Sequence, residues 1–135
     1  MEGDPKFVST PALAYLGDCV IELLVRSLLV ESGLQNSRKL NRKAMEYVTA
    51  PRQAEAAERI LPLLTEEEEA IYRRGHNMDH VNVPKNATRS EYLRASGLEA
   101  LFGYLYLLKD EGRIRDLFCA AYPQAEMEKR GNENE

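Results

Sequence analysis

Two apolar stretches with helical periodicity, each interrupted by one acid, constrain the fold of this chain more than any other feature. The first covers residues 12–30 and carries Asp18, and the second covers residues 97–108 and carries Glu99. A carboxylate set among apolar side chains needs a partner, a proton or a metal ion. We therefore expect two core helices whose packing brings Asp18 and Glu99 together at a metal ion. An alternative remains open, in which Asp18 caps a neighbouring element and Glu99 pairs with an arginine such as Arg94.

Composition predicts one soluble, cytoplasmic domain. The 135 residues are enough for a hydrophobic core without disulfide bonds. Cys19 and Cys119 lie in apolar helical patterns, so we expect small buried thiols in a reducing compartment. The first residues are acidic, unlike a secretory signal, and the run 19–30 is too short to span a bilayer. The net charge of −4 argues weakly against a nucleic-acid partner when taken alone.

Periodicity and capping residues predict an all-α fold of five to seven helices, since no stretch has a convincing period-two pattern. Gly97 and Gly103 fall inside a predicted helix, which indicates close approach of another helix. Residues 1–122 are expected to form the folded domain, and residues 123–135 a polar, frayed tail. The predicted helices cover about 11–31, 38–48, 51–61, a short segment after Thr65 and its run of glutamates, about 90–110 with Ser90 as cap, and a last helix ending near Tyr122.

Residues 75–89 have no apolar periodicity, and we expect Gly75 to end the preceding helix. Long loops in compact domains are often functional, although an ordinary polar loop would have the same composition. Basic and amide side chains in and beside this loop suit contacts with phosphates and sugar hydroxyls of double-stranded RNA. These candidates are Arg73, Arg74, Asn77, Asn82, Lys85, Asn86, Arg89 and Arg94.

Two further patterns favour simpler interpretations. The predicted helix 38–48 is rich in lysine and arginine, which is most simply a solvated basic face. His76 and His80 have the i, i+4 spacing of metal ligands on a helix. However, Gly75 and Asn77 disfavour a helix there, and no third ligand is evident.

Several motifs, in order along the chain, resemble one known family. Residues 12–20, Ala-Leu-Ala-Tyr-Leu-Gly-Asp-Cys-Val, resemble the signature of ribonuclease III, and residues 97–106, Gly-Leu-Glu-Ala-Leu-Phe-Gly-Tyr-Leu-Tyr, resemble its second motif. Residues 72–75 and 83–87 are similar to stretches of the short branch, Mini-ribonuclease III. The resemblance covers about residues 5–122.

This resemblance implies a helical endonuclease domain over residues 1–122 that dimerises by pairing its signature helices. It also implies Mg²⁺-dependent hydrolysis of double-stranded RNA to 5′-phosphate and 3′-hydroxyl ends. The short branch implies maturation of the 23S ribosomal RNA precursor and no separate RNA-binding domain. A ribosomal protein could assist in presenting the substrate, but no residue in the sequence specifies one. A non-catalytic RNA- or ribosome-binding helical protein with the same fold is the alternative.

By position, Asp18 and Glu99 match the family's catalytic and metal-binding acids. Ser96, acting through water, and Glu22, on the same helix side as Asp18, are expected to support them. Other acids of full-length family members are replaced here, at Pro11, Ala14 and Ser96. We therefore expect one Mg²⁺ ion, completed by substrate phosphate and waters.

Overall fold

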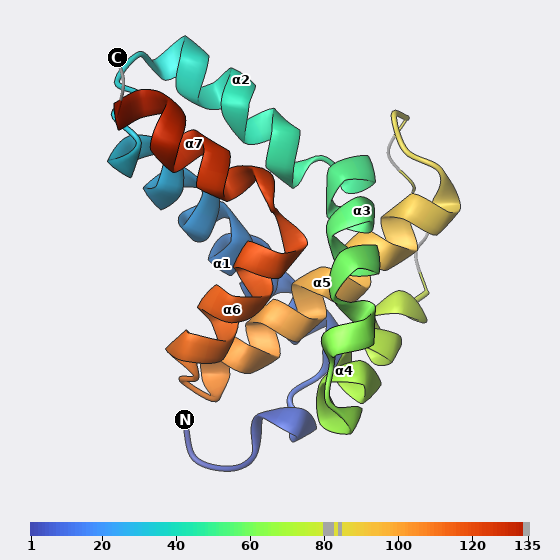
Figure 1. Cartoon of the computed structure of the whole chain (residues 1–135). Helices are drawn as coiled ribbons and strands as arrows, with labels where there is room; N and C mark the ends of the chain where they lie inside the picture. Colours follow the sequence, from blue (N-terminus) through green and yellow to red (C-terminus); the bar gives the residue numbers. More distant parts are fainter. Residues whose placement is uncertain (80–82, 84, 134–135) are drawn as a thin grey trace.

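The computed structural model describes residues 1–79, 83 and 85–133. The described residues contain no strand, which confirms the predicted all-α class (Figure 1). A short 3-10 helix, η1 (Pro5–Phe7), leads in, and another, η2 (Leu61–Leu63), connects two helices. The α-helices are α1 (Thr10–Glu31), α2 (Ser37–Val48), α3 (Ala50–Ile60), α4 (Glu66–His76), α5 (Arg89–Leu107), α6 (Glu111–Ala121) and α7 (Gln124–Glu133).

Helix α5 is the central element. Its residues from Ala95 to Leu105 are buried almost without interruption, and it packs against α1, α3, α4 and α6. Figure 1 shows α5 passing between these helices. Such burial on all sides explains why the sequence of α5 is apolar all round rather than along one stripe. A polar group in this buried part of α5 therefore lies at or beside a helix interface.

Capping side chains set most helix starts where the sequence predicts them. Ser9 accepts from the backbone of Ala12 at the start of α1, and Thr65 forms a capping box with Glu68 at the start of α4. The prediction of Ser90 as the cap of α5 is wrong. Thr88 is the cap, because its hydroxyl and the Glu91 carboxylate satisfy each other's backbone N–H groups.

Gly75 does not end α4, contrary to the prediction. The helix continues through His76, and Gly75 is buried against α5. A Cβ atom added at this position would lie 2.7 Å from both the Ala100 Cβ and the Ser96 carbonyl oxygen. Glycine is therefore needed at position 75 because α4 and α5 pack closely there, and not because the chain turns.

Residues 124–133 form helix α7, where the sequence predicted a frayed tail. Ala125 of α7 is buried, and Glu128 of α7 lies 2.9 Å from the Lys43 ammonium of α2. The turn that precedes α6 does not depend on a glycine. Gly112 lies inside α6, and the left-handed residue of the turn is Lys109, with φ of 60°.

One face of α1 is open to solvent. Tyr15 is 86% exposed and Leu23 is 60% exposed, and Cys19 lies between them at helical spacing. The prediction of buried thiols is therefore wrong for Cys19, and Cys119 is exposed as well. Within the described ranges, no helix combines the length and apolar character needed to cross a lipid bilayer.

Candidate active site

The crossing of α1 and α5 has no room for side chains at its centre. A Cβ atom on Gly17 would lie 1.6 Å from the Glu99 carbonyl oxygen, and one on Gly103 would lie 2.0 Å from the Leu13 carbonyl oxygen. The two backbones therefore touch directly. Because Asp18 follows Gly17 and Glu99 lies one turn before Gly103, this contact positions both acids.

The two carboxylates meet at this crossing, although they are 81 positions apart in the chain. Burial raises the pKa of Glu99 to about 8, and the charge of Asp18 and a side-chain hydrogen bond with it contribute further. Asp18 is exposed, so the expectation of two acids on core positions holds only in part. Glu99 does not pair with Arg94, which instead binds Glu58 at 3.0 Å.

The arrangement is chemically suited to a hard divalent cation. Both side chains offer oxygen ligands, and Asp18 leaves the site open to solvent and substrate. Mg²⁺ is commonly held by one or two carboxylates plus waters and substrate phosphates. Among the described residues, no group of three or more His, Cys, Asp or Glu side chains could hold a metal ion, so the protein would supply two carboxylates here.

Other polar groups near Glu99 are already engaged. Ser96 is buried one turn before Glu99, and its hydroxyl donates to the Tyr92 carbonyl oxygen at 3.0 Å. Tyr122 was not expected at this site. Burial and the nearby charge of Glu99 raise the pKa of Tyr122, whose hydroxyl donates to the Tyr47 carbonyl oxygen. No local pattern identifies Tyr122, because it reaches Glu99 only through the packing of the last helices.

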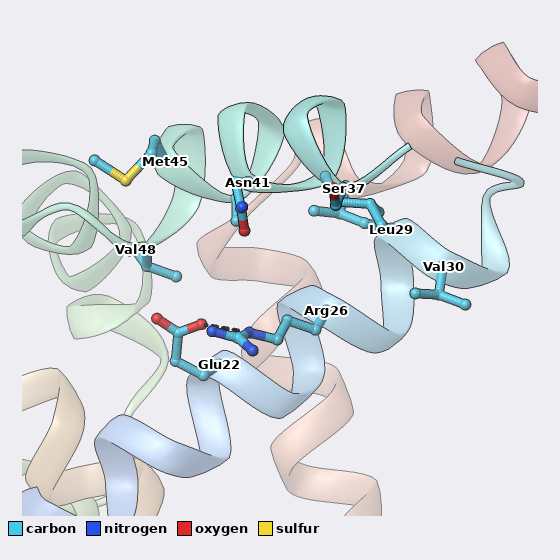
Figure 2. A pocket seen from close by; sticks show the side chains of 10 residues that line it. Glu22, Arg26, Leu29, Val30, Ser37, Asn41, Met45 and Val48 are labelled. Atoms are coloured by element: carbon cyan, nitrogen blue, oxygen red, sulfur yellow. Dashed lines mark hydrogen bonds and ion pairs between the residues drawn. The ribbon is translucent and has the colours of Figure 1, made fainter. Parts of the chain in front are cut away.

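A groove between α1 and α2 begins one turn beyond Asp18 (Figure 2). Glu22 and Arg26 of α1 form an ion pair at 3.1 Å along one wall, and Asn41 and Val48 belong to the α2 side. The carboxylate of Glu22 is thus bonded to Arg26 in this structure. Its predicted support of Asp18 stays a prediction.

The basic residues proposed to bind RNA occupy different environments. Arg73 pairs with Glu69 on α4. Arg74 donates to the carbonyl oxygens of Lys6 at 2.7 Å and Val8 at 2.8 Å, and to the Thr10 hydroxyl at 3.0 Å, so it fastens the N-terminal segment to α4. The remaining predicted contacts at Asn77, Lys85, Asn86 and Arg89 are exposed.

Of the histidine pair, His76 lies among the described residues, whereas His80, like Asn82, lies outside them. His76 ends α4, where its Nδ1 lies 3.1 Å from the Asn77 Oδ1 and its ring packs near Tyr72. These contacts account for His76 as part of the helix end.

Comparison with known proteins found a matching family model and several similar proteins. A Ribonuclease III domain model matches residues 11–110. Mini-ribonuclease 3 of Symbiobacterium thermophilum is 41% identical over 118 residues, covering 87% of this chain and 91% of that protein. Mini-ribonuclease 3 of Enterococcus faecalis is 40% identical, covering 84% of this chain and 88% of its own. A crystal structure of a protein from Fusobacterium nucleatum matches with a TM-score of 0.75 and 34% identity, covering 83% of this chain and 89% of that one.

The matched region contains the α1–α5 crossing and both carboxylates, and the fold is that of a ribonuclease III domain. The chain belongs to the ribonuclease III family, and within it to the Mini-ribonuclease III branch. It is accordingly an endoribonuclease.

Proposed function

We propose that this protein hydrolyses double-stranded RNA in a Mg²⁺-dependent reaction at Asp18 and Glu99, leaving 5′-phosphate and 3′-hydroxyl ends. The proposed substrate is the 23S ribosomal RNA precursor in the cytoplasm. The observation that carries the proposal is the meeting of two distant acids at a crossing that leaves one exposed and raises the pKa of the other to about 8. A bound cation strongly stabilises two neighbouring ionised carboxylates, because its positive charge offsets the repulsion between their negative charges.

Bound Mg²⁺ supplies an activated water and stabilises charge on the phosphate and the leaving 3′-oxygen. The chain's own groups have separate tasks. Glu99, on α5, provides the fixed carboxylate, because its backbone is in direct contact with α1. Asp18 is exposed, and we assign to it the orientation of the attacking water. Ser96 and Glu22 are proposed to support these two acids.

The proposed RNA contacts lie around the end of α4 and the start of α5. They are the side chains of Arg73, Asn77, Lys85, Asn86 and Arg89. Arg74 is also proposed, although its guanidinium group donates hydrogen bonds to the N-terminal segment in this structure. Contacts of this kind recognise duplex shape and backbone rather than sequence. Binding should therefore weaken steeply as salt rises.

We also propose a homodimer that pairs the open faces of two α1 helices. The exposed residues Tyr15, Cys19 and Leu23 are spaced four apart and form one stripe. An antiparallel pairing centred on Cys19 would set Tyr15 of one chain beside Leu23 of the other, so a single two-fold axis satisfies both copies. Such a dimer would carry two active sites, one for each RNA strand.

The experiment is cleavage of a long RNA duplex at low salt, with and without Mg²⁺. We expect the unmutated protein to cut only with Mg²⁺, and Asp18→Asn or Glu99→Gln to lower the rate by about 100-fold or more, as loss of a group acting in the transition state does. Glu31→Gln is the matched control, because it removes one exposed acid from the far end of the same helix.

Cleavage that persists in both site variants would contradict the proposal. If the unmutated protein instead shifts the duplex on a native gel but never cuts it, the alternative of a non-catalytic RNA-binding protein gains support. Circular dichroism of each variant checks that it remains folded.

A further inference from the structure

Helix α2 carries basic side chains without acidic partners in a chain of net charge −4. Lys43 is paired, with its ammonium 3.3 Å from Glu46 and 2.9 Å from Glu128. Arg38, Lys39 and Arg42 are exposed, and in the described part of the chain they form no ion pair. Within the described ranges, these three positive charges are therefore not neutralised by acidic side chains.

Two of these residues lie on the solvent side of the groove between α1 and α2, although neither belongs to its lining. Arg38 and Arg42 are one turn apart, and at about 100° per residue both follow the lining residue Met45 round the helix, Arg38 closely and Arg42 further toward solvent. Lys39 projects further round the helix. Figure 2 shows Asn41 on α2 above the groove, with Arg26 on α1 across from it. We call Arg26, Arg38 and Arg42 the arginine rim.

The arginine rim begins near the carboxylate pair. Asp18 and Arg26 are eight residues apart on α1, which corresponds to about 12 Å along the helix axis. Val48, at the end of α2, lines the same groove as Glu22, one turn beyond Asp18. A polyanion seated at Asp18 and continuing along the groove would therefore meet Arg26 first and the α2 arginines next.

Arg26 is free to change partner. Its ion pair with Glu22 is on the surface, with the Arg26 side chain 73% exposed, and such pairs contribute about 0–1 kcal/mol. A phosphate accepts the planar fork of a guanidinium with two parallel hydrogen bonds. Exchange of the Glu22 carboxylate for a phosphate therefore costs little.

We propose that the arginine rim binds the phosphate backbone of the RNA duplex beyond the cleaved position, in addition to the contacts at the start of α5. This inference rests on the proposed function, since it extends the same RNA-binding surface. Arg26 lines the groove, and Arg38 and Arg42 lie beside it on the solvent side, so the three side chains form one run of positive charge. A run of this kind matches the regular negative charge of a duplex backbone.

The test measures duplex RNA affinity against salt in an Asp18→Asn background, where the RNA stays intact. We expect Arg42→Ala to reduce the slope of log K against log salt by about 1, and Arg38→Ala/Arg42→Ala by about 2. Arg115→Ala is the matched control. Arg115 is exposed on α6, away from α2 in Figure 1, and its loss should leave the slope unchanged.

A charge-retaining variant, Arg38→Lys/Arg42→Lys, should keep the slope and so separates a charge effect from a folding defect. An unchanged slope in the double alanine variant would overturn the arginine rim while leaving the proposed function intact, and so would an equal loss in Arg115→Ala. If the Asp18→Asn protein binds no duplex at any salt, the proposed substrate itself is wrong.

Discussion

Glu99 holds its proton to a higher pH than an exposed carboxyl group does. Its pKa rises from 4.5 to about 8 because the side chain is largely desolvated and lies beside Asp18. The folded chain therefore binds this proton more tightly than the unfolded chain. Between pH 4.5 and about 8 the folded state retains more protons, so its stability falls as pH rises through that window.

We therefore expect Glu99→Gln to remove this pH dependence. Without divalent ions, the free energy of unfolding of the unmutated protein should fall by at least about 1 kcal/mol more between pH 5 and pH 9 than that of the variant. Urea melts at several pH values measure the difference. Glu31→Gln should behave like the unmutated protein, and parallel curves for all three proteins would show that Glu99 titrates normally.

At the residue scale, the sequence identified the two acids but not their exposure. Periodicity placed both on apolar helices, and their pairing followed. It could not show that Asp18 and Cys19 face solvent, because residues 12–30 have apolar side chains on every side of the helix. Which of those sides is covered depends on α2, α5 and α7, and that information is not local.

The close packing of helices α1 and α5 depends on glycine. Ala at Gly17 would place a methyl group 1.6 Å from a backbone oxygen that cannot rotate away. Overpacking costs about 1–3 kcal/mol and the contact here is severe, so we expect Gly17→Ala to lose about 3 kcal/mol despite the better helix propensity of alanine. It should also impair cleavage, since Asp18 is displaced.

We expect Gly112→Ala, at an exposed helix position, to raise the stability of the protein rather than lower it. The nearest atom to an added Cβ there is an Asp110 oxygen at 4.0 Å, so the variant should gain up to about 1 kcal/mol from helix propensity. Thermal melts of the two variants give the comparison. Equal effects at Gly17 and Gly112 would show that the α1–α5 contact is looser than described.

At the element scale, the start of α4 was easier to predict than the role of Gly75 near its end. The cap of α4 depends on Thr65 and Glu68, which are three residues apart, so the local sequence contains the whole interaction. Gly75 has the composition of a helix end but packs against Ala100 and Ser96 on α5. The local sequence does not distinguish a glycine required for close helix packing from a glycine required in a turn, because the packing partners are distant in the chain.

For the whole molecule, the exposed face of α1 is the surface at which we expect two copies to associate. If two copies pair there, Tyr15→Asp should shift the protein from dimer to monomer. Burial of a large aromatic side chain at an interface centre typically contributes about 2 kcal/mol or more, so the dissociation constant should rise at least about 30-fold. Sedimentation velocity over a concentration series measures this change.

Phe7→Asp is the control for the dimer, because Phe7 is 82% exposed but lies outside α1. It should leave the association unchanged. Mild oxidation should also join two chains through Cys19, which lies at the centre of the proposed pairing. A monomeric unmutated protein at all concentrations would contradict the dimer, without affecting the assignment of the carboxylate pair.

The contact of Gly17 with Glu99 and of Gly103 with Leu13 has a consequence for how this protein can diverge. The glycines are needed to close the fold, whereas Asp18 and Glu99 are needed only for the reaction. A descendant that lost catalysis could replace both acids. Replacing Glu99 would also remove the free-energy cost of burying its carboxyl group. It would still retain both glycines. Small residues at positions 17 and 103 should therefore outlast the acids, leaving a trace of descent in inactive relatives.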